Sequence, residues 1–179
     1  VPGQIPTDPM ASAAPYGEVA ACEVLGRWLA VRGPCRLVVG PRAASDALWS
    51  GFGNPAHRVR FDQRLYVCEE VSSGDVVPVR RAVSADLDQV VALSAAMQVE
   101  DMFENPLARN PDFFVSRVRT RIERGKTWVL DRDGQVVFVV NVGTCFSLGA
   151  QVGGTYTARS HRGKGLATGA MRSLCTHLL

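Results

Sequence analysis

The sequence predicts an α+β fold in which a mixed, mostly antiparallel sheet is flanked by helices. From Val77 onward, the order of elements is strand, helix, helix, strand, strand, strand, helix, which differs from the alternating series of a Rossmann domain. The run Asp131-Arg132-Asp133-Gly134 joins two apolar stretches and is typical of a β-hairpin, with a glycine available for positive φ. Asn110 and Pro111 indicate a helix start, and Gly125 indicates its end.

The other elements of this second half follow from apolar spacing. Ser84 can cap a helix whose first turn holds Asp86 and Asp88, where carboxylates interact favourably with the helix dipole. A last helix runs from about Gly165 to the chain end, with apolar residues at three- and four-residue spacing. The expected strands cover residues 77–81, 126–130, 135–142 and 151–157.

In the first half of the sequence we expect a helix, a strand, a helix and two further strands, in that order. These elements cover residues 18–30, 35–39, 45–49 (a helix start), 58–61 and 65–71. A shift in composition at Val71–Asp75 marks a domain boundary. We therefore divide the chain into an irregular lead-in at 1–15, a first part at 16–74 and a second part at 75–179.

Composition excludes several classes of protein. No apolar run approaches the ~20 residues that cross a bilayer, and no secretory signal begins the chain, so we expect a cytoplasmic protein without a membrane partner. A net charge of +3 is too small for a nucleic-acid binder with a concentrated basic face. The five cysteines are widely spaced and form no Cys-x-x-Cys pair, which argues against disulfides and a metal site: Cys22, Cys35, Cys68, Cys145 and Cys175.

The residues between the last strand and the last helix carry the strongest chemical signal. Gly163 and Gly165 lack a Cβ, so an anion can approach the backbone where the first N–H groups of a helix are unpaired. Arg162 and Lys164 add positive charge beside them. The pattern predicts an anion-binding turn.

With these residues the chain resembles the GNAT superfamily of N-acetyltransferases, whose pyrophosphate turn reads Arg/Gln-x-x-Gly-x-Gly/Ala. Arg162, Gly165 and Ala167 match it at the required strand-to-helix junction, and the resemblance covers roughly Val77 to Leu179. It implies that acetyl-CoA is the co-substrate and that an acetyl group passes to a primary amine of a small molecule or peptide. The cofactor-binding residues that it implies are Tyr156, Thr157, Arg162, Gly163, Lys164, Gly165, Leu166, Ala167 and Thr168.

The resemblance leaves the catalytic residues unassigned. The segment Gly153–Thr155 lacks the carboxylate that some family members carry there, and the tyrosine that protonates the leaving thiolate would lie beyond Leu179, so the chain looks truncated. His161 is expected to face solvent. A polar cluster could recognise an amine, although a solvated loop is the favoured interpretation: Glu100, Asp101 and Glu104.

The order of elements in residues 16–71 is the one that a complete GNAT domain has after its cofactor helix. We interpret this part as the closing half of a degenerate repeat in a tandem protein; a permuted half that completes the same sheet is the alternative. Pairing of its strands with the sheet of residues 77–157 would distinguish the permuted from the tandem arrangement.

Two other functions compete with the transferase. A non-catalytic acyl-CoA sensor or scaffold would share the binding site and lack turnover. A nucleic-acid binder would use an arginine-rich helix, but its arginines are spread around the helix, and we expect no nucleic-acid partner: Arg117, Arg119, Arg121 and Arg124. A homodimer is a candidate assembly.

Overall fold

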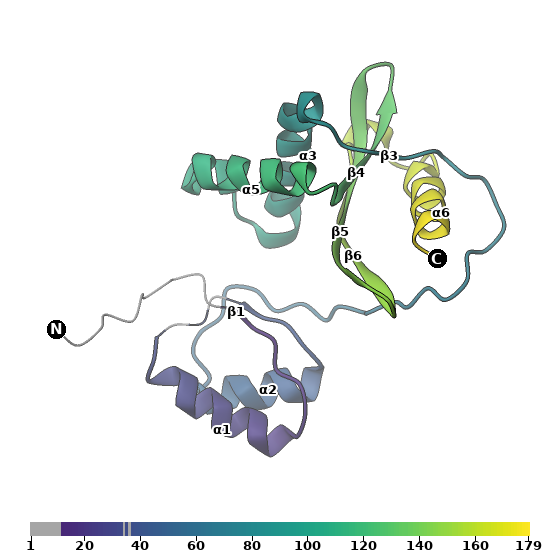
Figure 1. Ribbon diagram of the computed structural model, residues 1–179. Helices are drawn as coiled ribbons and strands as arrows, with labels where there is room; N and C mark the ends of the chain where they lie inside the picture. The colour runs from purple at the N-terminus through teal and green to yellow at the C-terminus, as the bar shows by residue number, and fades with distance from the viewer. Residues whose placement is uncertain (1–11, 34, 36) are drawn as a thin grey trace. The chain divides into compact units, whose positions relative to one another are not determined.

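The computed structural model describes residues 12–33, 35 and 37–179, which divide into two compact units. The first is Val1–Leu65 and the second is Tyr66–Leu179 (Figure 1). Residues 66–74, which we assigned to the first part from the sequence, belong to the second unit. Residues 1–11 of the expected lead-in at 1–15 lie outside the described residues. Within the rest of it, Ser12–Ala13 form a short strand, so this part is not wholly irregular.

The first unit is a pair of helices with a small parallel sheet. Its elements are β1 (Ser12–Ala13), α1 (Val19–Ala30), β2 (Leu37–Val38) and α2 (Arg42–Gly51), and β1 pairs with β2. Its core is built from small side chains and one fully buried leucine: Cys22, Ala44, Ala47 and Leu48. The two helices cross where Gly26 and Gly51 meet. Their backbones lie so close there that a Cβ on Gly26 would collide with the Leu48 carbonyl, and one on Gly51 with the Glu23 carbonyl. Glycine is therefore required at this crossing.

Two strands predicted for this region are wrong. Residues 58–61 and 65–71 form no ladder, and the side chains of Leu65 and Tyr66 are 92% and 83% exposed. Apolar residues in these segments indicated that they could form strands. A strand also needs a neighbouring strand to supply its hydrogen bonds. Of the predicted strand 35–39, only Leu37–Val38 is a strand, and residue 36 lies outside the described residues.

The second unit holds the predicted antiparallel sheet, which confirms the α+β class. Its strands, in the order β3-β4-β5-β6, are β3 (Arg80–Arg81), β4 (Thr127–Arg132), β5 (Gln135–Phe146) and β6 (Gly149–Thr157). Its helices are α3 (Leu87–Met102), α4 (Pro106–Arg109), α5 (Pro111–Glu123) and α6 (Leu166–Leu178), with 3₁₀ turns η1 (Ser84–Asp86) and η2 (Arg159–His161). The strand predicted at 77–81 is confined to its last two residues.

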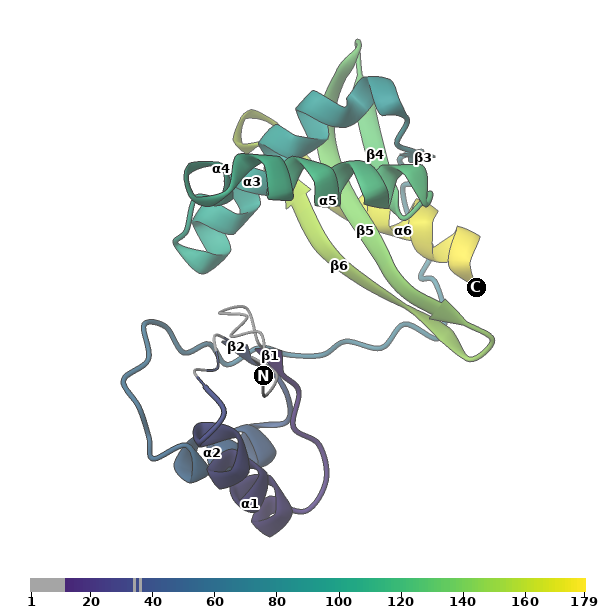
Figure 2. The same ribbon diagram turned by 60° about the vertical axis from the view of Figure 1, so that its left-hand side comes forward.

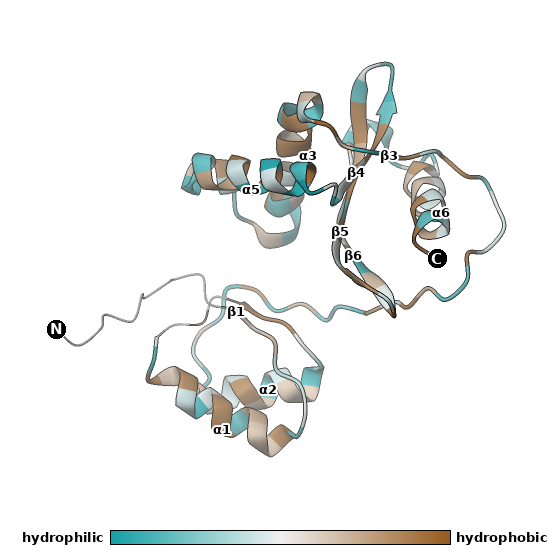
Figure 3. Ribbon diagram, viewed as in Figure 1, coloured by the Kyte–Doolittle hydropathy of each residue, from teal (hydrophilic) through white to brown (hydrophobic). Residues whose placement is uncertain are grey.

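Helices cover both faces of this sheet (Figures 1 and 2). On one face, α3 and α5 pack on Val129, Val139 and Tyr156. On the other, Ala170 and Leu174 of α6 are fully buried against the strands. Hydrophobic and hydrophilic residues alternate in bands along α5 (Figure 3), as an amphipathic helix requires.

A β-bulge adapts the central strand to both layers. The register of β4 with β5 shifts so that Leu130 pairs with Phe138 and Asp131 with Val136, which leaves Val137 as an extra residue. Val137 and Phe138 consequently both belong to the core beneath α6, whereas Val136 and Val139 belong to the core beneath α3.

The predicted start and end of the helix after Asn110 are confirmed, whereas Ser84 does not cap a helix. The Asn110 side chain accepts a hydrogen bond from the Phe113 N–H at 3.1 Å, Pro111 is the first helical residue, and Gly125 follows the helix end with φ +62°. The helix expected at Ser84 starts as a 3₁₀ turn, in which Asp86 accepts from the Val83 N–H and bidentately from Arg80. These bonds lower the pKa of Asp86.

Each unit has its own sheet, which is the arrangement expected of a tandem protein. However, the last two strands predicted for the first repeat did not form. The described residues of the first unit contain a strand, a helix, a strand and a helix, in that order. The repeat origin of residues 16–74 stays a prediction.

Candidate functional site

The turn before α6 exposes backbone in the way the sequence predicted. Gly163 and Gly165 have φ values of +74° and +71°, a region that side-chain-bearing residues rarely adopt, and a Cβ on either would meet nothing within 4 Å. Helix α6 begins at Leu166 without a side-chain cap. Its first intrahelical bond runs from the Gly169 N–H to the Gly165 carbonyl, so the N–H groups of the first turn remain available to a ligand.

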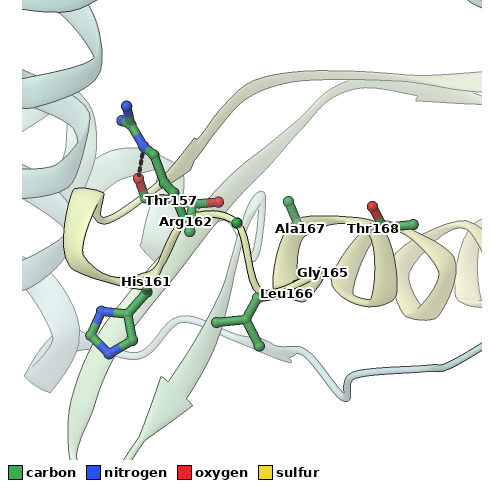
Figure 4. Close-up of a pocket in the computed structure, with 8 residues that line it drawn as sticks. Thr157, His161, Arg162, Gly165, Leu166, Ala167 and Thr168 are labelled. Carbon is green, nitrogen blue, oxygen red and sulfur yellow. Dashed lines mark hydrogen bonds between the residues drawn. The ribbon is translucent and has the colours of Figure 1, made fainter.

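A cavity of about 290 Å³ opens onto this turn (Figure 4). Of the nine predicted cofactor-binding residues, seven line this cavity, and Lys164 is one of the two that do not. Tyr156 also lies outside the lining, whereas His161, which we left unassigned, belongs to it. The lining residues are Thr157, His161, Arg162, Gly163, Gly165, Leu166, Ala167 and Thr168.

The two cations predicted for the anion are engaged elsewhere. The Arg162 side chain points away from the start of α6 (Figure 4), and its Nε donates to the Thr157 carbonyl at 2.9 Å. Its guanidinium lies 4.8 Å from the centre of the Tyr156 ring. Lys164 Nζ donates to the Ser160 carbonyl at 3.2 Å. The backbone of the turn, more than these side chains, therefore faces the cavity.

Glu100 accepts hydrogen bonds from Tyr156, Arg159 and Arg162, and we call these four residues the Glu100 network. Its Oε1 accepts from the Tyr156 hydroxyl at 2.6 Å and from Arg159 Nε at 2.8 Å, and its Oε2 lies 3.0 Å from Arg162 Nη1. Hydrogen bonds from Tyr156, Arg162 and Arg159 lower the pKa of Glu100 to about 2. A carboxylate with this pKa is a weak base at neutral pH, so its chemistry is that of a fixed negative charge.

The favoured interpretation of Glu100 as part of a solvated loop is wrong. Helix α3 continues to Met102, so Glu100 and Asp101 are helical, and the Glu100 side chain is only 24% exposed. Glu104 follows the helix and pairs with Arg109 at 2.9 Å. The signal was available in part, because Glu100 follows the inward-facing Met97 by three residues, but nothing in the sequence places it against Tyr156.

The Glu100 network predicts a pH-dependent stability. Because the folded-state pKa lies below the ordinary value of 4.5, ionised Glu100 stabilises the second unit above about pH 4.5, and this contribution is lost as the pH falls towards 2. Glu100→Gln should lower the midpoint of urea unfolding at pH 7, and most of the difference from wild type should be lost by pH 2. Asp101→Asn, at the exposed neighbouring position, is the control. A constant difference between wild type and Glu100→Gln from pH 7 to pH 2 would contradict this role.

Strand β6 offers backbone groups along its second edge. It is the last strand in the sheet order of the described residues, with β5 as its neighbour. The Ala158 N–H donates to the Val137 carbonyl, so the alternation of an antiparallel ladder turns the backbone of Thr157 towards the unpaired edge. Arg162 donates to the Thr157 carbonyl on this edge, and the Thr157 N–H faces the same way, where an extended ligand could accept from it.

A second bulge lies on β6 between residues 153 and 156, where the family pattern would place a carboxylate. The register shifts from Val139–Tyr156 to Asn141–Gly153, and Gly154 adopts φ +61°. Buried Asn141 holds this bulge: its Oδ1 accepts from Thr127 at 2.9 Å, and a Cβ on Gly154 would lie 2.6 Å from its Nδ2. The sequence showed Asn141 as a polar residue ending an apolar run, without indicating this role.

Comparison with solved structures finds acetyltransferases. The chain is 18% identical to an acetyltransferase of the GNAT family from Colwellia psychrerythraea, with a TM-score of 0.47 over 60% of this chain and 38% of that one. The chain is similar to GNAT-family acetyltransferases. A GCN5-related N-acetyltransferase from Ralstonia eutropha is 20% identical, with a TM-score of 0.46 over 55% of this chain and 73% of that one.

A third similar structure, a predicted acetyltransferase from Clostridium acetobutylicum, was solved with acetyl-CoA; it is 16% identical, with a TM-score of 0.43 over 55% of this chain and 71% of that one. No protein-family model and no curated protein matches the sequence. At these identities the similarity concerns the fold and leaves the activity open.

Two further findings bear on the class of protein. None of the described helices is both long enough and apolar enough to cross a membrane. In the part of the chain that the structure describes, no three histidine, cysteine or acidic side chains come together as a metal-binding group.

Proposed function

We propose that this chain binds acetyl-CoA at the turn before α6 and transfers its acetyl group to a primary amine. The observation that carries the proposal is a continuous binding surface, which joins the uncapped first turn of α6, two glycines at positive φ and the unpaired edge of β6. Helix N-termini attract phosphate through exposed N–H groups and the helix dipole. The resemblance of the turn to the GNAT pyrophosphate pattern assigns the phosphate group to a coenzyme A.

The electrostatic balance around the turn also favours an anion. Arg159 and Arg162 carry two positive charges and share the single negative charge of Glu100. Lys164 adds a further positive charge on the same loop. The excess positive charge lies beside the backbone amides and raises their attraction for a diphosphate.

The edge of β6 suits an extended, amide-containing arm. A pantetheine chain that lies along this edge can bond to the free Thr157 N–H, as a peptide adds to a sheet edge. This arm would direct the thioester towards the bulge at Gly154. There, the neutral amine would form a bond to the acetyl carbon and the carbon–sulfur bond would break. The proton that the nitrogen loses would balance the one that the departing coenzyme A thiolate takes up.

The chain's own residues contribute mainly by positioning. Glu100 is too weak a base to deprotonate the amine at neutral pH, and its bonds hold Arg162 and Tyr156 in place. Since orientation alone accounts for much of the rate of acyl transfer in a bound complex, a site without an assigned base is compatible with catalysis.

A non-catalytic acyl-CoA sensor is the second candidate. It is favoured by the residues at the β6 bulge, where glycines stand in place of a carboxylate, and by the engagement of Glu100 with two arginines. Both functions require the same binding surface.

One experiment tests the proposal and separates the two candidates. Acetyl-CoA should raise the melting temperature of the protein, and incubation with a panel of primary amines should release free thiol. A raised melting temperature without thiol release would support the sensor, and the absence of any thermal shift at millimolar acetyl-CoA would refute both.

A further inference from the structure

A second cavity, of about 130 Å³, lies at the C-terminal end of α6, the end opposite to the glycine turn. It is bounded by residues from β3, β4 and β5, the connection after α5 and the last turn of α6. The lining residues are Arg81, Arg124, Gly125, Lys126, Trp128, Val142, Cys145, His177 and Leu178. Four are basic and none is acidic, so this cavity differs from its surroundings in charge.

The cations in this cavity have no acidic partners. Within the described residues, no carboxylate pairs with Arg81, Arg124 or Lys126. The neighbouring Arg80, by contrast, pairs with Asp86 at 2.6 Å and approaches Asp131 at 3.8 Å. A bound anion would supply the negative charge that the described residues do not place beside these cations.

Trp128 organises these cations without using their hydrogen-bond donors. Its side chain is 8% exposed, the Arg81 guanidinium lies 5.4 Å from its ring centre, and the His177 ring lies 4.7 Å from it. Contact with a ring face fixes a guanidinium while its N–H groups remain free for an acceptor.

The helix ends explain only part of this cluster. Arg124 follows α5 and His177 lies in the last turn of α6, where a positive charge interacts favourably with the helix dipole. Arg81 belongs to a strand and derives no such benefit from its own element. Arg81 lies over Trp128 and lines the same cavity as Lys126, so an anion in this cavity would meet both cations.

We propose that this cavity is a second anion-binding site, which takes one phosphoryl or carboxylate group of a small ligand. Arg81 and Lys126 would bind the anionic group, and Val142 and Leu178 would contact its apolar part. The volume is that of about four water molecules, which suits a single anionic group. The site shares no lining residue with the glycine turn, so it is independent of the proposed transferase function.

The test uses the full chain at constant ionic strength, with phenyl phosphate, inorganic phosphate and benzoate as probes in NMR titrations. We expect shifts of the Gly125 and Trp128 amides with phenyl phosphate or benzoate. Arg81→Gln and Lys126→Gln should each weaken this binding at least about tenfold, the amount expected for loss of one charge-assisted hydrogen bond. The inorganic phosphate arm reports whether the anionic group alone suffices.

Two matched variants control the test. Arg119→Gln removes an exposed arginine from α5 outside the cavity and should leave the affinity unchanged, as should Gly165→Glu at the other end of α6. Equal affinities in wild type, Arg81→Gln and Lys126→Gln, an equal loss in Arg119→Gln, or no binding of any probe would each overturn the proposal. Because two separate cavity variants are used, misfolding of one does not prevent a decision.

Discussion

Gly165→Glu is expected to abolish acetyl-CoA binding while leaving the second unit folded. The new carboxylate would stand at the start of α6, in the open space that now gives an anion access to the first-turn amides. It would repel a diphosphate and compete with it for the same N–H groups. Isothermal titration with acetyl-CoA should show a loss of affinity of at least about a hundredfold, since several charge-assisted hydrogen bonds are affected together.

The controls separate charge from backbone strain. Any residue other than glycine at position 165 must adopt φ near +71°, at a cost of about 1–2 kcal/mol in stability. Gly165→Gln has the bulk and the strain of the glutamate without its charge, and Gly165→Ala has the strain alone. Binding by Gly165→Glu as tight as that of Gly165→Gln would show that the cofactor's diphosphate lies elsewhere.

Phe138→Ala should destabilise the second unit by about 3–5 kcal/mol. Phe138 is fully buried beneath α6, at the bulge where β5 contributes two consecutive residues to one core. Removing its ring leaves a cavity that the rigid sheet cannot close. Since a small domain has only about 5–15 kcal/mol of stability in total, this change approaches the limit of what the unit tolerates.

Phe146→Ala is the matched control, because this phenylalanine lies on the same strand and is 59% exposed. It should change the stability by less than about 0.5 kcal/mol. Hydrogen exchange of the β4 and β5 amides reports on the second unit separately from the first. Similar effects of the two substitutions would contradict the assignment of Phe138 to the core.

Local sequence signals predicted the second unit well. The Asn110–Pro111 start, the Gly125 stop and the hairpin at 131–134 are fixed by backbone geometry within a few residues, and all are found in the structure. The apolar face of α6 was also predicted correctly, because helical spacing determines which residues share a face. These elements placed the glycine turn at its strand-to-helix junction.

Features that depend on distant partners escaped sequence analysis. Alternation at 58–61 indicated a strand, yet none of the strands in the described residues pairs with it. Glu100 lies 56 residues before Tyr156 in the chain, and only folding brings the two side chains together. For the same reason Arg162 was assigned to the anion, although its guanidinium binds a carboxylate from α3.

The crossing of α1 and α2 has a consequence for how the first unit tolerates mutation. Two backbones touch there because side chains are absent at positions 26 and 51, so even an alanine pushes the helices apart and uncovers Leu48. In a library randomised at both positions, selection for folded protein should recover glycine almost alone, whereas large apolar residues of the second unit, such as Val139, should exchange with others of similar volume. The two units would thus accept substitutions under different constraints. The first requires the absence of a Cβ at two positions, and the second requires conservation of core volume.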